Sequence, residues 1–276
     1  MSHYINFPLK ALVKLMGFVK AREAIWLVAF IVIVSAPLRL YQLNTHPPGL
    51  FGDEAADGLD ALSIISGNRP LFLTENNGRE PLHAYLVALS LDALGRTPVA
   101  VRLPSALAST LTVLTIFLAT RAIIGTRIAL IASIISGFTV WPIMLGRLAT
   151  RPALLPFFLS ITLWLVIEAY KRKNNKLWTL AGLILGISVY TYTPIRLLII
   201  FPVLCLSALF VGQIRKRIIL GTTYFCLSFA IIVSPFVMYT VKQVESLKEF
   251  RTFVNDEVFT KKDFLNFKSV DEKIGL

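Results

Sequence analysis

Long apolar runs recur through most of this sequence, separated by short breaks that carry charge. Runs of about 18 to 25 residues match a helix that crosses the roughly 30 Å hydrocarbon core of a bilayer. Strand-like alternation of polar and apolar residues is scarce, so we expect helices and not a β-barrel. Because 55% of the 276 residues are hydrophobic and only 16% are charged, the chain carries more apolar surface than a water-soluble core could bury. The sequence predicts an all-α integral membrane protein.

Seven apolar runs can be drawn along the chain, and we expect about seven transmembrane helices. They cover residues 23–42, 100–124, 127–146, 152–170, 177–193, 196–213 and 217–240. We therefore expect a membrane domain over 23–240, preceded by an amphipathic cytoplasmic segment (1–22) and followed by a polar extracytoplasmic tail (241–276). Residues 43–99 are too many for a simple connection and contain turn sequences between two short helical patterns. We expect them to form a small extracytoplasmic cap of helices.

The basic residues predict the orientation of the spans. Clusters of Lys and Arg fall at alternate span ends, which the positive-inside rule places in the cytoplasm. These clusters are Lys10, Lys14, Lys20 and Arg22; Arg121 and Arg127; Lys171, Arg172, Lys173 and Lys176; and Arg215, Lys216 and Arg217. The acids provide a partly independent check of this assignment, and all except Glu23 and Glu168 then fall outside. We expect a multi-pass protein of the cell inner (plasma) membrane, with a cytoplasmic amino terminus.

The run from Pro81 to Gly95 is apolar but is not expected to cross the membrane. If it crossed, every later basic cluster would face outward, against the positive-inside rule. We expect a helix lying in the outer interface, with Asp92 and His83 turned towards water.

The stretch HPPGLFGDEAADGLDA, residues 46–61, places four acids at the start of a predicted cap helix. Two prolines end the preceding helix, and Asp53 is well placed to cap the new one. Asp53, Asp57 and Asp60 share one helix face, with Glu54 beside it. A carboxylate here could act as a general base towards a polar acceptor, although acids in a first helical turn also stabilise the helix dipole without catalysis. We expect Asp57 and Asp60 to be solvated or capping residues.

Three arginines are candidates for binding phosphate. Arg147 and Arg151 in GRLATRP and Arg196 in YTYTPIR lie at predicted outer ends of helices. An arginine near hydrocarbon needs a partner, and the guanidinium fork matches phosphate oxygens. The alternatives are that these side chains reach lipid headgroups or pair with the acids of the cap.

Three further charged residues are expected to support the cap. Arg79 and Glu80 in NNGREPLHAY are interpreted as a local ion pair that holds the cap together. Arg102, at the outer start of the second span, is expected to pack against the cap acids.

Nucleic acid and metal ions are both weak candidates as ligands. The net charge of +12 comes from short clusters of Lys and Arg, without the basic stripe and stacking aromatics that nucleic-acid binding requires. The three histidines lack the spacing of a zinc site. Asp53 with Glu54 offers oxygens to a divalent cation, but no second acidic loop accompanies them. We assign no metal ligand and no certain cofactor, and a divalent cation stays an open alternative.

Five stretches together resemble a known group of enzymes. They are PPGLFGDEAADGLDAL, NNGREPLHAYLVALS, VRLPSALASTLTVLTIFLATR, GRLATRPALLPFF and YTYTPIRLLIIFP. In this order they are similar to the bacterial polyprenyl-phosphate-sugar-dependent glycosyltransferases of the C superfamily. The similarity is closest to the family that groups with dolichyl-phosphate-mannose protein mannosyltransferases and the aminoarabinose transferases of lipid A, and it covers about residues 20–260.

The resemblance implies a reaction and a site. In such enzymes the first external loop carries an acidic residue beside the site, which Asp53 with Glu54 matches here. This carboxylate would deprotonate an acceptor hydroxyl or amine, which attacks the anomeric carbon of a polyprenyl-phosphate sugar with inversion while the lipid phosphate departs. Arginines in external loops, here Arg147, Arg151 and Arg196, would stabilise the phosphate as charge develops.

Two departures from the family pattern keep a second hypothesis open. Related sequences often carry an acid in the loop matching GRLATRP, where this chain has Arg and Pro, which leaves metal dependence and part of the acceptor site in question. Family members also usually continue with further membrane helices, whereas this chain corresponds to the N-terminal membrane half. The alternative is a truncated, non-catalytic subunit of a larger complex of membrane proteins. A transporter is weaker, because paired inverted segments with broken helices are not evident.

Overall fold

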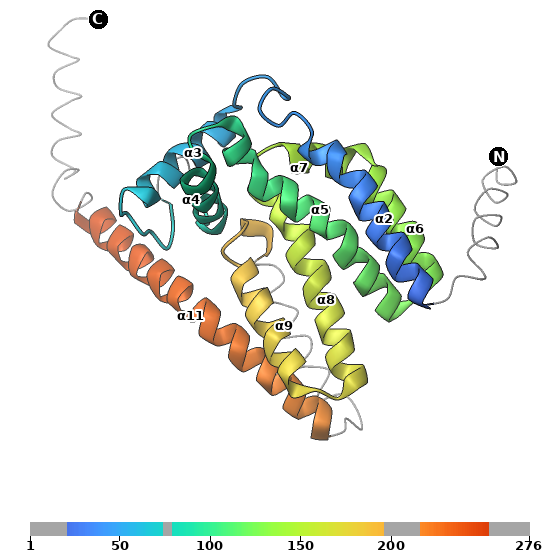
Figure 1. Ribbon diagram of the computed structural model, residues 1–276. Coiled ribbons are helices and arrows are strands. Elements are labelled where there is room, and N and C mark those ends of the chain that lie inside the picture. The colour runs from blue at the N-terminus through green and yellow to red at the C-terminus, as the bar shows by residue number, and fades with distance from the viewer. Residues whose placement is uncertain (1–20, 74–78, 196–215, 254–276) are drawn as a thin grey trace, which may run out of the picture. The chain divides into compact units, whose positions relative to one another are not determined.

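The computed structural model describes residues 21–73, 79–195 and 216–253. Regular structure in these ranges is helical apart from one isolated antiparallel bridge between Leu73 and Arg79. The helices are α2 (Ala21–Leu40), α3 (Gly52–Ile65), α4 (Leu82–Leu94), α5 (Pro98–Ile123), α6 (Thr126–Phe138), α7 (Val140–Arg147), the 3-10 turn η2 (Arg151–Ala153), α8 (Leu154–Arg172), α9 (Asn175–Ser188) and α11 (Lys216–Phe253) (Figure 1). The predicted all-α fold class is confirmed.

Four of these helices, α2, α5, α8 and α11, are long and apolar enough to cross a membrane. α6 and α7 form a fifth candidate, a pair bent by 53°. The predicted run 177–193 becomes α9, whose 14 residues rise about 21 Å, less than the roughly 30 Å of a bilayer core. The run 196–213 lies outside the described residues. The described chain therefore supports four or five spans, and the count of seven stays a prediction.

The bend between α6 and α7 follows from Pro142. A proline ring clashes with the carbonyl of the residue four positions earlier, which is Phe138, and lacks the N–H of an internal helical residue. α6 ends at Phe138, and Pro142 falls in the first turn of α7, where proline is tolerated. The run 127–146, expected as one span, is thus a broken one.

The chain divides after Val233 into two compact units. The first unit holds the helices from α2 to α9 and the start of α11. The second unit, residues 234–276, is described as far as Phe253 and consists there of the rest of α11. The domain boundaries predicted at 22/23 and 240/241 stay predictions.

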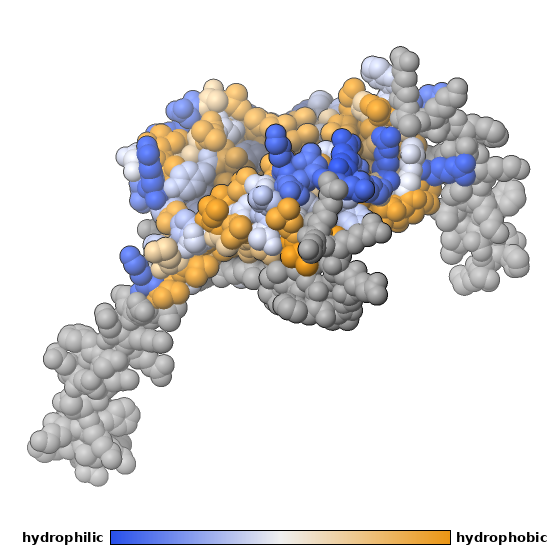
Figure 2. Space-filling model, turned by 90° about the horizontal axis from the view of Figure 1, so that it is seen from below, coloured by the Kyte–Doolittle hydropathy of each residue, from blue (hydrophilic) through white to orange (hydrophobic). Residues whose placement is uncertain are grey.

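α5 lies between α2 and α6 on one side and α8 on the other (Figure 1). Its inner residues Val113 and Phe117 pack with Val28 of α2 and Leu130 of α6 in a buried cluster. Large apolar side chains also point outward, such as Trp26, which is 71% exposed. Figure 2 shows hydrophobic residues over much of the visible surface, with hydrophilic ones gathered in a band across that face. Outward-facing apolar surface on this scale suits helices surrounded by lipid.

The cap consists of α3 and α4, packed on the start of α5. Ala61 of α3 and Val87 and Leu91 of α4 form a buried cluster with Val101 of α5 and Ala149, which follows α7. The 13 residues of α4 rise about 20 Å, too short for an upright span. This length agrees with the expected non-crossing helix, although its place in the interface stays a prediction.

The segment after α9 is held in place by close helix packing. A Cβ on Gly186 of α9 would lie 2.7 Å from Cβ of Ile232 in α11, so only glycine allows this approach. The Tyr190 hydroxyl donates to the carbonyl of Ile232 at 2.8 Å, and the Tyr190 carbonyl accepts from the backbone N–H of Leu82 at 3.0 Å. The segment around Tyr190 is thereby attached to the start of α4.

Candidate functional site

Asp53 is an exposed carboxylate in the first turn of α3. It makes no hydrogen bond or ion pair with the described part of the chain. The expectation that Asp53 caps α3 is wrong. Phe51 is the N-cap residue, and its backbone N–H donates to Oε2 of Glu54 at 2.9 Å. Asp53 is therefore left accessible to a ligand or to solvent.

Glu54, the neighbouring acid, is completely buried and fully engaged. Arg102 donates to both of its oxygens, from Nε to Oε1 and from Nη2 to Oε2, each at 2.9 Å. The backbone N–H of Ala149 donates to Oε1 and that of Phe51 to Oε2, also at 2.9 Å. Burial alone would raise the pKa of Glu54, but these hydrogen bonds and the charge of Arg102 together hold the pKa below its usual range. Glu54 therefore stays ionised.

Arg102 joins Glu54 to the loop that enters the cap. Its guanidinium donates to the carbonyls of Leu43 at 2.9 Å, Pro47 at 2.8 Å and Gly49. Arg102 is completely buried, and its bidentate pair with Glu54 is the charged contact at the base of the cap. The expected packing of Arg102 against a cap acid is confirmed.

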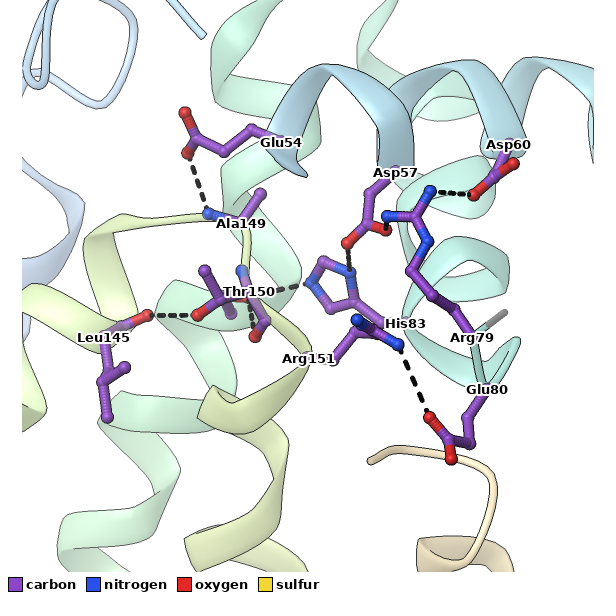
Figure 3. A network of polar contacts seen from close by, with 11 residues as sticks. Glu54, Asp57, Asp60, Arg79, Glu80, His83, Leu145, Ala149, Thr150 and Arg151 are labelled. Carbon is purple, nitrogen blue, oxygen red and sulfur yellow. Dashed lines mark hydrogen bonds and ion pairs between the residues drawn. The ribbon is translucent and has the colours of Figure 1, made fainter. Parts of the chain in front are cut away.

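A second buried charge cluster lies one turn along α3 (Figure 3). Arg79 contacts Asp57 Oδ1 and Asp60 Oδ2, each at 2.7 Å, and Asp57 Oδ2 lies 2.7 Å from Nδ1 of His83. Asp57, Asp60 and His83 are 2%, 9% and 0% exposed. The expectations that the two acids are solvated and that His83 faces water are therefore wrong, because this face of α3 packs on α4 and on Arg79. Asp92 is exposed, as expected.

Hydrogen bonds connect Asp57 through His83 to the loop after α7. Nε2 of His83 shares a hydrogen bond of 2.9 Å with the Ser105 hydroxyl in α5. That hydroxyl oxygen also accepts from the backbone N–H of Thr150 at 3.2 Å and lies 3.2 Å from the Thr150 carbonyl, so its single hydrogen is available either to this carbonyl or to Nε2 of His83. A carboxylate only accepts, so Nδ1 of His83 carries the hydrogen that faces Asp57. Ser105, His83 and Asp57 are thus connected by hydrogen bonds. Because Ser105 is completely buried, we assign it a structural role.

Glu80 has partners different from those of Arg79. It is completely buried, its Oε1 accepts from the Thr193 hydroxyl at 2.8 Å, and its Oε2 lies 3.5 Å from Nη1 of Arg151. The ion pairs of Arg79 are with Asp57 and Asp60 instead. The two side chains therefore hold different parts of the structure together and do not form the local pair expected from their adjacency.

Arg147 and Arg151 of GRLATRP lie on either side of a short loop, residues 148–150, whose backbone is held by hydrogen bonds. Arg147 is partly buried and donates to the carbonyls of Leu38 at 3.0 Å and His46 at 2.9 Å. The side chain of Arg151 is 22% exposed. Between them, the backbone N–H groups of Ala149 and Thr150 are held by Glu54 and Ser105. Both arginines thus stand at the edges of a rigid loop. The third candidate, Arg196, lies outside the described residues.

An apolar groove lies between α4, α5 and α8. It has a volume of about 540 Å³ and is lined by residues that include Leu89, Leu103, Leu107, Leu154 and Phe158. Leu154 begins α8 directly after the turn that carries Arg151. The groove therefore includes a residue that follows Arg151 closely in the chain.

A metal site is not evident in residues 21–73, 79–195 and 216–253. No group of three or more His, Cys, Asp or Glu side chains in these ranges is arranged to hold an ion. The buried cap acids are instead engaged by Arg79, Arg102, Arg151 and His83.

The fold has counterparts among solved membrane glycosyltransferases of the C type. One is the protein O-mannosyltransferase Pmt1–Pmt2 complex of S. cerevisiae bound to its sugar donor, with a TM-score of 0.65 at 20% identity over 87% of this chain and 35% of that one. Another is the Archaeoglobus fulgidus oligosaccharyltransferase tethered with an acceptor peptide, with a TM-score of 0.59 at 15% identity over 92% of this chain and 38% of that one. The protein is thus a multi-pass membrane protein with the fold of this enzyme class.

The family model described as dolichyl-phosphate-mannose-protein mannosyltransferase matches residues 78–239, more than half of the chain, and the chain belongs to this family. The resemblance to the C superfamily is confirmed. A comparison with curated protein sequences gives no match. The chain spans a little over a third of the length of the two solved relatives, 35% and 38%.

Proposed function

We propose that the protein transfers a sugar from a polyprenyl-phosphate donor to an extracytoplasmic hydroxyl or amine acceptor, with inversion. The observation that carries this proposal is the contrast between Asp53 and Glu54. Glu54 is buried and saturated by four hydrogen bonds, whereas the adjacent Asp53 is exposed and unpaired within the described chain. A general base needs an accessible lone pair, so we assign that role to Asp53 and a positioning role to Glu54.

In the proposed reaction, Asp53 takes the proton of the acceptor as its oxygen or nitrogen bonds to the anomeric carbon. The bond from that carbon to the phosphate oxygen breaks, and its electron pair leaves with the lipid phosphate. Arg147 and Arg151 lie on either side of the loop 148–150 and would stabilise the negative charge on the departing lipid phosphate. Arg196 is proposed for the same role. Glu80 positions Arg151 through its contact at 3.5 Å.

The apolar groove supports a lipid-linked donor. A polyprenyl chain is wholly apolar and matches the apolar lining of this groove. Since Leu154 follows Arg151 by less than one helical turn, a phosphate at Arg151 would have its chain at the groove entrance.

We propose that the cap faces the outside of the cell inner (plasma) membrane and that the amino terminus is cytoplasmic. The cap helices α3 and α4 lie at the opposite end of α8 from its junction with α9 (Figure 1). That junction carries Lys171, Arg172, Lys173 and Lys176. The separation of cap and basic cluster agrees with the positive-inside rule.

A second candidate function is a non-catalytic subunit that assembles with other membrane proteins. It is supported by one of the solved relatives, which is a complex of two proteins. Purification in mild detergent separates the two proposals. A lone chain that transfers sugar supports the enzyme, whereas an inactive chain that copurifies stoichiometrically with another membrane protein supports the subunit.

The general base is tested by Asp53→Asn in membranes supplied with labelled polyprenyl-phosphate sugars. We expect turnover to fall on the order of 100-fold or more, as for loss of a general base. Asp92→Asn is the matched control, because Asp92 is also an exposed acid of the cap. Equal turnover in the wild type and Asp53→Asn would eliminate the assigned base.

A further inference from the structure

Arg39 is a completely buried arginine in the last turn of α2. An arginine inside a membrane helix is energetically costly and requires partners. In the described chain these partners are neutral: the Ser109 hydroxyl and the carbonyls of Ser35, Ser136 and Gly137. A full positive charge is thus held without a carboxylate, which calls for another source of negative potential.

The end of α6 supplies that potential. Ser136 and Gly137 lie in its last turn, where carbonyls have no N–H partner from a continuing helix. Nη2 of Arg39 donates to Ser136 at 2.8 Å and Nη1 to Gly137 at 2.9 Å. A helix C-terminus carries roughly half a negative charge, and a carbonyl without a hydrogen-bond donor is strongly unfavourable in hydrocarbon. One guanidinium therefore provides both the missing donors and the complementary charge.

The same side chain also reaches α7. Nε of Arg39 donates to the Ser109 hydroxyl at 2.9 Å, and this hydroxyl donates to the carbonyl of Pro142 at 2.9 Å. A Cβ on Gly146 would lie 2.6 Å from Cβ of Ser109 and 3.6 Å from Cγ of Arg39, so α7 passes directly against both. Arg39 thus connects both halves of the broken span.

We propose that Arg39 is a positioning residue, which caps α6 within the membrane and fixes the 53° bend that places Arg147. Arg147 is the last residue of α7 and donates to the carbonyl of Leu38, the neighbour of Arg39. A lysine is a poor replacement, because its single nitrogen cannot span the points that the guanidinium fork reaches. The capping role stands by itself, whereas the effect on phosphate through Arg147 rests on the proposed function.

The capping role is tested by the distance between spin labels on α6 and α7. Labels at Ile128→Cys and Met144→Cys, both exposed sites, are used after both native cysteines are changed to serine. We expect Arg39→Gln to shift or broaden the distance distribution and Arg39→Lys to do so less. Arg96→Gln, at an exposed arginine, should leave it unchanged. A native distribution in Arg39→Gln would overturn the proposal.

If Arg39→Gln does not fold, Ser109→Ala provides the milder test. It removes only the hydroxyl that links Arg39 to Pro142. A smaller shift in label distance is expected, and an unchanged distance in this folded variant would overturn the proposal that Arg39 fixes the bend through its link to α7.

The link to Arg147 is tested by a double-mutant cycle on sugar transfer. Arg39→Gln and Arg147→Gln are each expected to lower kcat/KM for the lipid donor about tenfold. If Arg39 acts through Arg147, the double variant loses little more than either single one. An additive loss of about 100-fold would refute this link. If even the wild type transfers no sugar, the proposed function fails, while the label distances still decide the capping role.

Discussion

Glu54→Gln removes the negative charge at the base of the cap while keeping the size of the side chain. Arg102 then stays completely buried without its charged partner. Breaking a buried ion pair by removing one member costs about 3 to 5 kcal/mol. Against a total stability of roughly 5 to 15 kcal/mol for a typical domain, this loss would shift unfolding to markedly lower denaturant concentration or temperature.

The measurement is equilibrium or thermal unfolding of the detergent-purified protein, followed by loss of helical signal. Asp53→Asn is the matched control: the same helix and the same change of acid to amide, at an exposed site where about 0.5 kcal/mol or less is expected. The double variant Glu54→Gln with Arg102→Met should recover part of the loss, because neither charge is then stranded. Similar stability of Glu54→Gln and Asp53→Asn would refute the assignment of Glu54 as a structural ion.

The pKa of Glu54 lies below its ordinary 4.5 in the folded state. The free energy of unfolding should therefore decrease as the pH falls below about 4.5. Unfolding measured at each pH should show a weaker dependence on pH in Glu54→Gln. His83→Ala should cost about 1 to 3 kcal/mol in the same assay by breaking the link from Asp57 to Ser105. Leu107→Trp, which fills the apolar groove, should raise KM for the lipid donor, whereas Leu180→Trp on α9 should not. A chelator should leave transfer unchanged, because arginines engage the buried cap acids.

The sequence predicted the membrane fold well because apolar run length is a local property. The runs 23–42, 100–124 and 152–170 correspond to α2, α5 and α8. The break within 127–146 was not predicted. Pro142 could have indicated it, because in a continuous helix its ring would clash with the carbonyl of Phe138.

The buried charges were harder to predict because their partners are distant in the chain. Helical spacing placed Asp57 and Asp60 on one face, but gave no indication that Arg79, on the far side of a turn, would cover that face. Arg39 was missed altogether, although an arginine within an apolar run is itself a signal for a specific partner. Sequence reasoning also did not single out Ser105, whose hydroxyl is an ordinary feature of an apolar helix until His83 is placed beside it.

The contacts of Glu54 also determine when the cap can be completed during synthesis. Its partner Ala149 lies 95 residues further along the chain, beyond α5, α6 and α7. At translation rates of about 5 to 20 residues per second, on the order of 5 to 20 s separate the emergence of the two. During that interval the first loop lacks the backbone donor that completes its base. A nascent chain arrested before Ala149 would therefore have an incomplete cap, which we expect to be cut more readily by proteases than the completed cap.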